Sequence, residues 1–178
     1  RCVRRRRFVT HTRIPDLLAA TGEPETYTMT ETEPAVAALE RARLLCELRR
    51  FAEAAELARR AIATTPDDAE GWCLLGQALL GSDDDVSALD AARRATALAP
   101  ESEWPHRLQS IALTSLGRDA EALTAALEGV RCEPFAWQTH ARVAGASVAV
   151  GLKEQATMAA ARAVELAPGV AQVWVVSG

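Results

Sequence analysis

The residues best suited to acid–base or metal chemistry are two histidines, His106 and His140, which lie 34 residues apart. If that spacing reflects a structural repeat, the two rings stack roughly 10 Å apart, the distance between packed helices. Proton transfer requires hydrogen-bond distances, and metal ligation requires bond distances. We therefore interpret both histidines as structural residues.

Cysteines and acidic residues indicate no site either. The sequence has four cysteines, which form no CxxC pair and have no nearby histidine at ligand spacing: Cys2, Cys46, Cys73 and Cys132. We therefore expect these cysteines to be small, buried hydrophobic residues of a protein in a reducing compartment. The run 83–85 (Asp-Asp-Asp) lacks the spaced ligands and glycine of an EF-hand loop. The sequence also contains no P-loop, HExxH, GxSxG or GxGxxG motif. We therefore expect no enzyme, no cofactor and no metal site.

The composition favours closely packed helices. Hydrophobic residues make up 49% of the 178 residues and aromatic residues only 4%, while alanine, the best helix former, makes up roughly a fifth. One lysine (Lys153) beside nineteen arginines is typical of a GC-rich, bacterial genome. No apolar run approaches the roughly 18 residues that cross a membrane. We expect a cytoplasmic protein with no membrane contact.

Charge is divided unevenly along the chain. The net charge is −4; residues 1–28 sum to +3, so residues 29–178 sum to −7. Because binding to nucleic acid depends on clustered cations, we expect the acidic body to bind none. Five arginines within residues 1–7 leave a nucleic-acid or membrane-surface arm as an alternative for the N-terminus.

The N-terminal segment predicts little structure. Residues 5–8 (Arg-Arg-Arg-Phe) resemble a twin-arginine export signal, but no apolar stretch follows. Met29, followed by Thr-Glu-Thr-Glu-Pro, is typical of a bacterial start, so residues 1–28 are expected to be translated from upstream or inherited from a fragment. We expect residues 1–34 to form a poorly ordered tail.

The rest of the chain repeats every 34 residues. Four prolines keep this period: Pro66, Pro100, Pro134 and Pro168. Small residues keep it in three further columns: Ala42, Gly76, Ser110 and Ala144; Ala54, Ala88, Ala122 and Ala156; Ala61, Ala95, Gly129 and Ala163. Each period contains two stripes of apolar residues at helical spacing. Gly117 and Gly151 lie where a first helix must end, and the prolines end each second helix. Helices are expected near 35–48, 51–64, 69–81, 85–98, 103–116, 119–132, 136–150 and 153–166, with a ninth starting near 170.

This pattern resembles the tetratricopeptide repeat. The second repeat matches the family best, through Trp72, Leu75, Gly76, Leu79, Ala88, Ala95 and Pro100. The resemblance implies an all-α, right-handed superhelical solenoid of helix-turn-helix repeats at 35–68, 69–102, 103–136 and 137–170, with a partial fifth at 171–178. Two repeat positions depart from the family pattern. In the second helix, alanine replaces a bulky residue in all four repeats: Ala58, Ala92, Ala126 and Ala160. In the first helix, the tryptophan is replaced in three repeats, by Ala38, His106 and His140. The alanines predict tighter packing of the second helices.

The resemblance also implies a function in protein binding. First helices of such repeats line a concave groove, where the expected partner-binding residues are Leu39, Arg43, Glu47, Leu74, Gln77, Trp104, Arg107, Leu108, Ile111 and Arg142. Such a groove suits a peptide, and its arginines suit an acidic one, because the guanidinium donates two parallel hydrogen bonds to a carboxylate. The alternative for the arginines is a solvated face.

We hypothesise a cytoplasmic bacterial scaffold or adaptor that binds a protein or peptide. One alternative is a non-catalytic targeting or regulatory arm of a larger enzyme or transcriptional regulator whose active domain follows Gly178. Another is an array that packs against a neighbouring domain and binds no external ligand. The partner, the pathway and the oligomeric state are not encoded in any recognisable motif.

Overall fold

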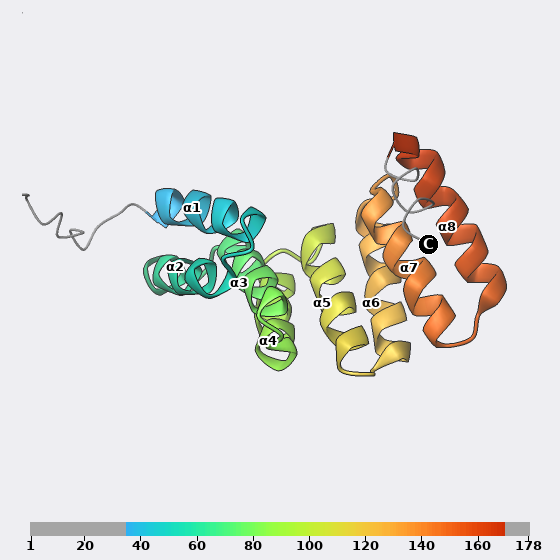
Figure 1. The fold of residues 1–178 in the computed structure, drawn as a ribbon, viewed down its shortest axis with the longest axis horizontal. Helices are drawn as coiled ribbons and strands as arrows, with labels where there is room; N and C mark the ends of the chain where they lie inside the picture. The colour runs from blue at the N-terminus through green and yellow to red at the C-terminus, as the bar shows by residue number, and fades with distance from the viewer. Residues whose placement is uncertain (1–34, 170–178) are drawn as a thin grey trace, which may run out of the picture. The chain divides into compact units, whose positions relative to one another are not determined.

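The computed structural model describes residues 35–169, which lie within the unit Thr32–Gly178 of the chain. These residues form helices and no strand (Figure 1). The helices are α1 (Ala35–Glu47), α2 (Phe51–Thr64), α3 (Ala69–Gly81), α4 (Asp85–Leu98), α5 (Glu103–Ser115), α6 (Asp119–Cys132), α7 (Trp137–Ala149) and α8 (Lys153–Leu166).

The expected all-α solenoid is confirmed, and each of the eight helices lies within one residue of its expected bounds. The small differences fall at the ends of first helices, where residues such as Leu48, Leu116 and Val150 already leave the helix. The expected tail at 1–34, the ninth helix and the partial fifth repeat fall on residues 1–34 and 170–178, outside those that the structure describes.

The turn inside each hairpin follows one backbone pattern. The second residue after each first helix has a positive φ, and these four residues are again 34 apart: Arg49 (58°), Asp83 (60°), Gly117 (71°) and Gly151 (81°). In each hairpin the following amide donates to a carbonyl five residues back, as Arg118 does to Leu113 at 2.8 Å. This is the Schellman arrangement, which supplies donors to the last carbonyls of a helix. The role expected for Gly117 and Gly151 is therefore confirmed.

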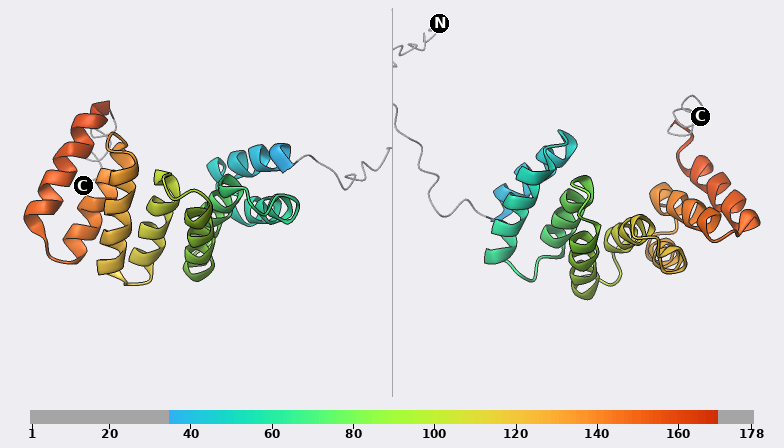
Figure 2. Two further views of the ribbon diagram at one scale, coloured as in Figure 1. Left: turned by 180° about the vertical axis from the view of Figure 1, so that it is seen from behind. Right: turned by 60° about the horizontal axis from the view of Figure 1, so that its bottom comes forward.

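The hairpins stack in one dimension. Each helix contacts the next along the chain, and the first helices α1, α3, α5 and α7 also contact one another in succession. Among the described residues, the second helices of neighbouring repeats make no such contact. Figure 2 shows the succession of hairpins from two further directions. The first helices therefore lie side by side along one face, which we call the inner face, while the second helices are spread apart.

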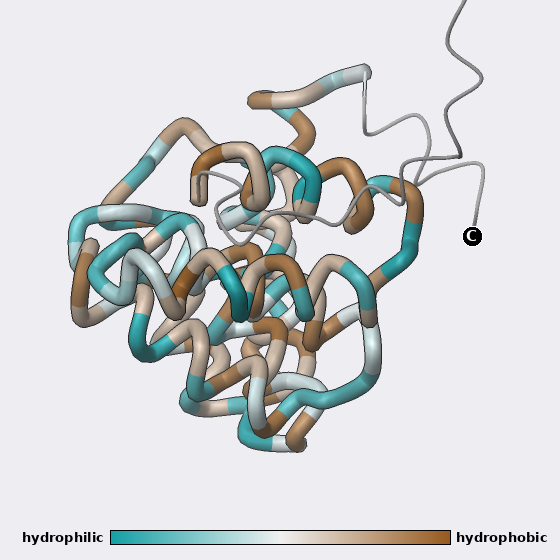
Figure 3. The backbone as a smooth tube through the Cα atoms, turned by 90° about the vertical axis from the view of Figure 1, so that its left-hand side faces the viewer, coloured by the Kyte–Doolittle hydropathy of each residue, from teal (hydrophilic) through white to brown (hydrophobic). Residues whose placement is uncertain are grey.

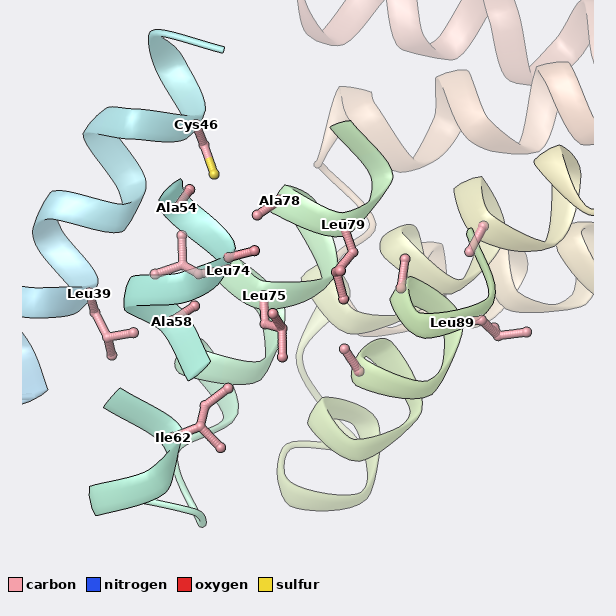
Figure 4. Close-up of a cluster of buried hydrophobic side chains, with 14 of the residues drawn as sticks. Leu39, Cys46, Ala54, Ala58, Ile62, Leu74, Leu75, Ala78, Leu79 and Leu89 are labelled. Atoms are coloured by element: carbon pink, nitrogen blue, oxygen red, sulfur yellow. The ribbon is translucent and has the colours of Figure 1, made fainter. Parts of the chain in front are cut away.

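The core between these helices is built largely from alanine and leucine. Ala54, Ala88 and Ala122 have at most 1% of their surface exposed, and Ala58 and Ala92 have none exposed. Figure 4 shows Ala54 and Ala58 of α2 among leucines of α1 and α3. In Figure 3, brown hydrophobic segments alternate with teal hydrophilic ones along the helices, as expected for helices with one buried side. The alanine columns therefore allow each second helix to approach closely the first helices on either side of it.

We predict that Ala88→Leu and Ala122→Leu each lower the free energy of unfolding by about 1–3 kcal/mol, because added methylene groups overpack a closed interface. Urea or thermal unfolding measures the change. Ala97→Leu is the matched control, since Ala97 lies exposed on α4. Equal stability of Ala88→Leu and Ala97→Leu would show that the alanine column does not limit helix approach.

Candidate partner-binding face

Three leucines expected to line the groove lie in the core instead. Leu39, Leu74 and Leu108 have exposed fractions of 7%, 1% and 3%. Leu39 and Leu74 belong to the main buried cluster, and Leu108 packs in a second one with Cys73. These side chains hold the first helices together, so any contact with a partner must come from their more exposed neighbours.

Exposed groups of the inner face come from positions next to those leucines. Glu47 and Gln77 are exposed, whereas Trp104, Arg107 and Ile111 are half-buried. The last three follow one another at i, i+3 and i+7 on α5, so they share one side of that helix. An aromatic ring, a cation and an aliphatic side chain thus form one stripe at the middle of the inner face.

Arg43 forms an ion pair with Glu70, which joins α1 to α3. Both side chains are about half exposed, and an ion pair in such a setting contributes little to stability because water competes for it. The pair nevertheless neutralises Arg43 in the free protein. A partner's carboxylate would therefore have to compete with Glu70 for this arginine.

Arg107 is also paired, but within its own helix. Its Nε donates to Oε2 of Glu103 at 3.1 Å and its Nη2 donates to Oε1 at 3.3 Å. The two side chains are 25% and 13% exposed, so this two-point contact is more protected than the Arg43 pair. The bonds orient the guanidinium and leave its Nη1 atom for a further acceptor.

Cys73 of α3 lies within the electrostatic reach of these charged groups. Burial raises the pKa of its thiol to about 12; Arg107 opposes this shift, while nearby carboxylates, including those of Glu70 and Glu103, add to it. A thiol with this pKa is almost wholly protonated near pH 8, and only the thiolate is nucleophilic. Cys73 is therefore a packing residue beneath the charged groups.

Arg142 of α7 differs from the other two arginines, because no described carboxylate forms an ion pair with it. Its guanidinium is half-buried, and burial first and Arg107 second lower its pKa. The positive charge of Arg107 on α5 thus acts on Arg142 of α7, a helix that contacts α5. Arg43, in contrast, pairs with Glu70.

The two histidines have structural roles. Nε2 of His106 lies 3.0 Å from the carbonyl oxygen of Pro100, and Nε2 of His140 lies 2.9 Å from that of Pro134. The indole of Trp72, one period earlier, donates to the carbonyl oxygen of Pro66 at 2.8 Å. A carbonyl only accepts, so each histidine must donate from Nε2. Tryptophan and histidine thus make the same bond to the proline that ends the preceding repeat, a role the sequence analysis missed although the 34-residue spacing signalled it.

Two hollows lie away from the inner face. One of about 430 Å³ is formed by α1 and α2 and lined by Leu44, Leu45 and Leu57 among others. Another of about 290 Å³ lies beside Trp72 and Arg94. Within residues 35–169, no three His, Cys, Asp or Glu side chains gather as metal ligands would. Nor does any described helix combine the length and apolarity needed to traverse a bilayer.

We predict that His106→Phe lowers the free energy of unfolding by about 1 kcal/mol, because it keeps a ring but removes the donor to Pro100. Chemical denaturation measures this loss. His106→Gln, which keeps a donor, serves as the comparison. A Phe variant as stable as the wild type would show that the bond contributes nothing.

We also predict an order of cysteine alkylation among Cys46, Cys73 and Cys132. With iodoacetamide near pH 8, native protein should react first at Cys132, because this thiol is half-buried whereas the other two are buried. Cys73 should react only after denaturant is added, given its raised pKa and its burial. Peptide mass spectrometry gives the order, and rapid labelling of Cys73 in folded protein would contradict it.

Comparisons with known proteins agree with this geometry. Residues 35–78 match the family model described as tetratricopeptide repeat. No curated protein matches the chain. Among solved structures, a thermophilic tetratricopeptide repeat protein of Thermus thermophilus, TTC0263, is similar with a TM-score of 0.71 and 21% identity over 75% of each chain.

Two MamA structures are also similar. One has a TM-score of 0.67 and 20% identity over 78% of this chain and 81% of the other. MamA from Desulfovibrio magneticus RS-1 has a TM-score of 0.67 and 16% identity over 79% and 78%. At these identities the likeness concerns the fold. The resemblance to the tetratricopeptide repeat family is thus confirmed: residues 35–78 match its model, and residues 35–169 have its fold.

Proposed function

We propose that this chain is a non-catalytic scaffold that binds a protein or peptide through its inner face. The observation that carries the proposal is the α5 stripe, in which Trp104, Arg107 and Ile111 remain partly exposed on one side of a helix. Tryptophan and arginine are enriched among the residues that dominate binding energy at interfaces. Stacked helical repeats use such extended faces for binding.

The partner is a peptide segment with apolar and acidic residues. Trp104 and Ile111 offer apolar contacts, and the arginines of α1, α5 and α7 offer charge. Arg43 and Arg107 already form ion pairs with carboxylates of this chain. They therefore favour a partner whose carboxylate replaces the internal one or binds the arginine beside it. The buried free thiols Cys46 and Cys73 are compatible with a reducing, cytoplasmic compartment.

We predict that a photo-crosslinking amino acid at Gln77 captures the partner, whereas the same amino acid at Arg60 does not. Gln77 is exposed on the first helix α3, and Arg60 is exposed on the second helix α2. The two full-length variants are irradiated in the source cell, and crosslinked peptides are identified by mass spectrometry. A single protein segment recovered from Gln77 in replicate experiments is expected. Equal capture at both positions, or capture at Arg60 alone, would place binding elsewhere.

A further inference from the structure

Helix α8 leaves exposed a side that the other second helices bury. Each of α2, α4 and α6 contacts the first helix of its own hairpin and that of the next, whereas α8 contacts only α7 among the described helices. The contrast is clearest at one repeat position. Ala160 is exposed there, whereas its three equivalents have no exposed surface: Ala58, Ala92 and Ala126.

On the earlier second helices, this side receives the start of the next hairpin. A Cβ atom added at Gly71 of α3 would lie 3.2 Å from Cγ1 of Ile62 on α2. A Cβ atom added at Gly129 of α6 would lie 3.0 Å from Cγ2 of Thr139 on α7. Gly71 and Thr139 occupy the same repeat position, and both are buried. One position of the first helix thus packs against the last turns of the second helix before it.

The corresponding residues of α8 are only partly covered. Ile62 is 8% exposed, but its equivalent Val164 is 49% exposed. Ala163, the equivalent of Gly129, is half-buried. We call Ala160, Ala163 and Val164 the end face of α8. The residue that would meet this face by repetition of the contacts above is Val173, one period after Thr139.

The two ends of the described array differ in their side chains. At the α1 end, Glu40 and Arg41 are exposed at the positions where the second repeat has the buried Leu74 and Leu75. Charged residues suit a helix side that ends an array in water. The end face of α8 has no such replacement, because it keeps the small and apolar residue types that meet a further helix in the earlier repeats. It therefore has the composition of an interface.

The residues that follow α8 have a matching composition. Residues 170–178 carry no charge and contain four valines and one tryptophan. A valine-rich, uncharged stretch favours aggregation unless it is buried. The chain also leaves α8 as it leaves α2: Ala167 has φ −140° and ψ 70°, and Thr65 has φ −132° and ψ 72°. The path out of α8 therefore starts in the same direction as the path that leads from α2 to α3.

Trp174 continues the series of rings that bind proline carbonyls. It lies one period after His140 and three periods after Trp72, and Pro168 lies one period after Pro134. In the described repeats, the ring nitrogen at this position lies 2.8–3.0 Å from the carbonyl oxygen of the proline six residues earlier. An indole N–H at residue 174 can donate in the same way.

We propose that residues 170–178 pack back onto α8 and cover its end face, with Val173 against Ala163 and Val164 and the indole of Trp174 donating to the carbonyl oxygen of Pro168. Burial of the valine-rich segment removes apolar surface of both partners from water. Because the segment follows α8 directly, it meets the face at a far higher effective concentration than a separate molecule does. Cover of the end face is independent of binding at the inner face.

Disulfide crosslinking of the full-length chain tests this contact. Val164→Cys and Val173→Cys are combined in a chain that also carries Cys2→Ser and Cys132→Ser. The equivalent residues of the first two repeats, Ile62 and Gly71, lie close enough for such a bond. Under mild oxidation we expect rapid formation of an intrachain disulfide, seen as a mobility shift without reductant.

Met158→Cys combined with Val173→Cys is the matched control for the crosslink. Met158 is 74% exposed on the same helix, but it lies about 120° around the helix from Val164. We expect much slower oxidation of this pair. A third variant adds Trp174→Ala to the 164–173 pair and should oxidise more slowly, whereas Trp174→His should restore the rate, because histidine makes the same bond in two repeats.

Two neighbouring alanines provide a test without new cysteines. Ala160 and Ala161 are both exposed on α8, but the equivalents of Ala160 are buried, whereas those of Ala161 are exposed in every repeat: Arg59, Arg93 and Leu127. Ala160→Arg should therefore displace the segment and raise deuterium uptake by residues 170–178 to that of the same peptide in isolation. Ala161→Arg should leave the slower uptake of the wild type unchanged.

Three results would overturn the proposal. A disulfide between two chains at the 164–173 pair would show that a second copy covers the end face. Equal oxidation of the 164–173 and 158–173 pairs would show that the segment has no fixed place on α8. Equal deuterium uptake by the two arginine variants would show that the end face does not hold the segment. None of these results bears on binding at the inner face.

Discussion

Close approach of helices at alanine is the constraint on which this array depends. Ala54, Ala88 and Ala122 are at most 1% exposed, and each has only a methyl group at the interface between helices. A closed interface of this kind tolerates little added volume. The same spacing therefore recurs from hairpin to hairpin, and the first helices are held next to one another as a single face.

The turn between paired helices was only partly predictable. Gly117 and Gly151 indicate a helix end in the left-handed conformation, because glycine adopts it without a steric penalty. Arg49 and Asp83 occupy the same turn position with positive φ, although neither residue type predicts a left-handed conformation. Period and proline positions, by contrast, were enough to place the helices within one residue. Backbone hydrogen bonding and the buried alanine columns impose one geometry on turns whose residues differ.

The inner face was less predictable than the fold. Side chains on successive residues of a helix point about 100° apart, so the expected groove set combined buried residues such as Leu74 with exposed ones such as Gln77. The Arg43–Glu70 pair joins residues 27 apart in sequence, and it depends on how α1 and α3 are rotated. That Arg43, Arg107 and Arg142 are the polar binding residues of one groove stays a prediction. Their different pairing could be seen only once neighbouring helices were in place.

Stacking in one dimension also has a mechanical consequence. Each hairpin contacts only the hairpins beside it within the described residues. Each interface between neighbouring hairpins therefore acts as a joint at which the angle between them can change. Small angular displacements at successive joints add up with distance along such a chain. Groups on helices in direct contact, such as α5 and α7, thus change their separation little, whereas the span from α1 to α7 changes with every joint between them. A long ligand along the inner face would meet the sum of those changes.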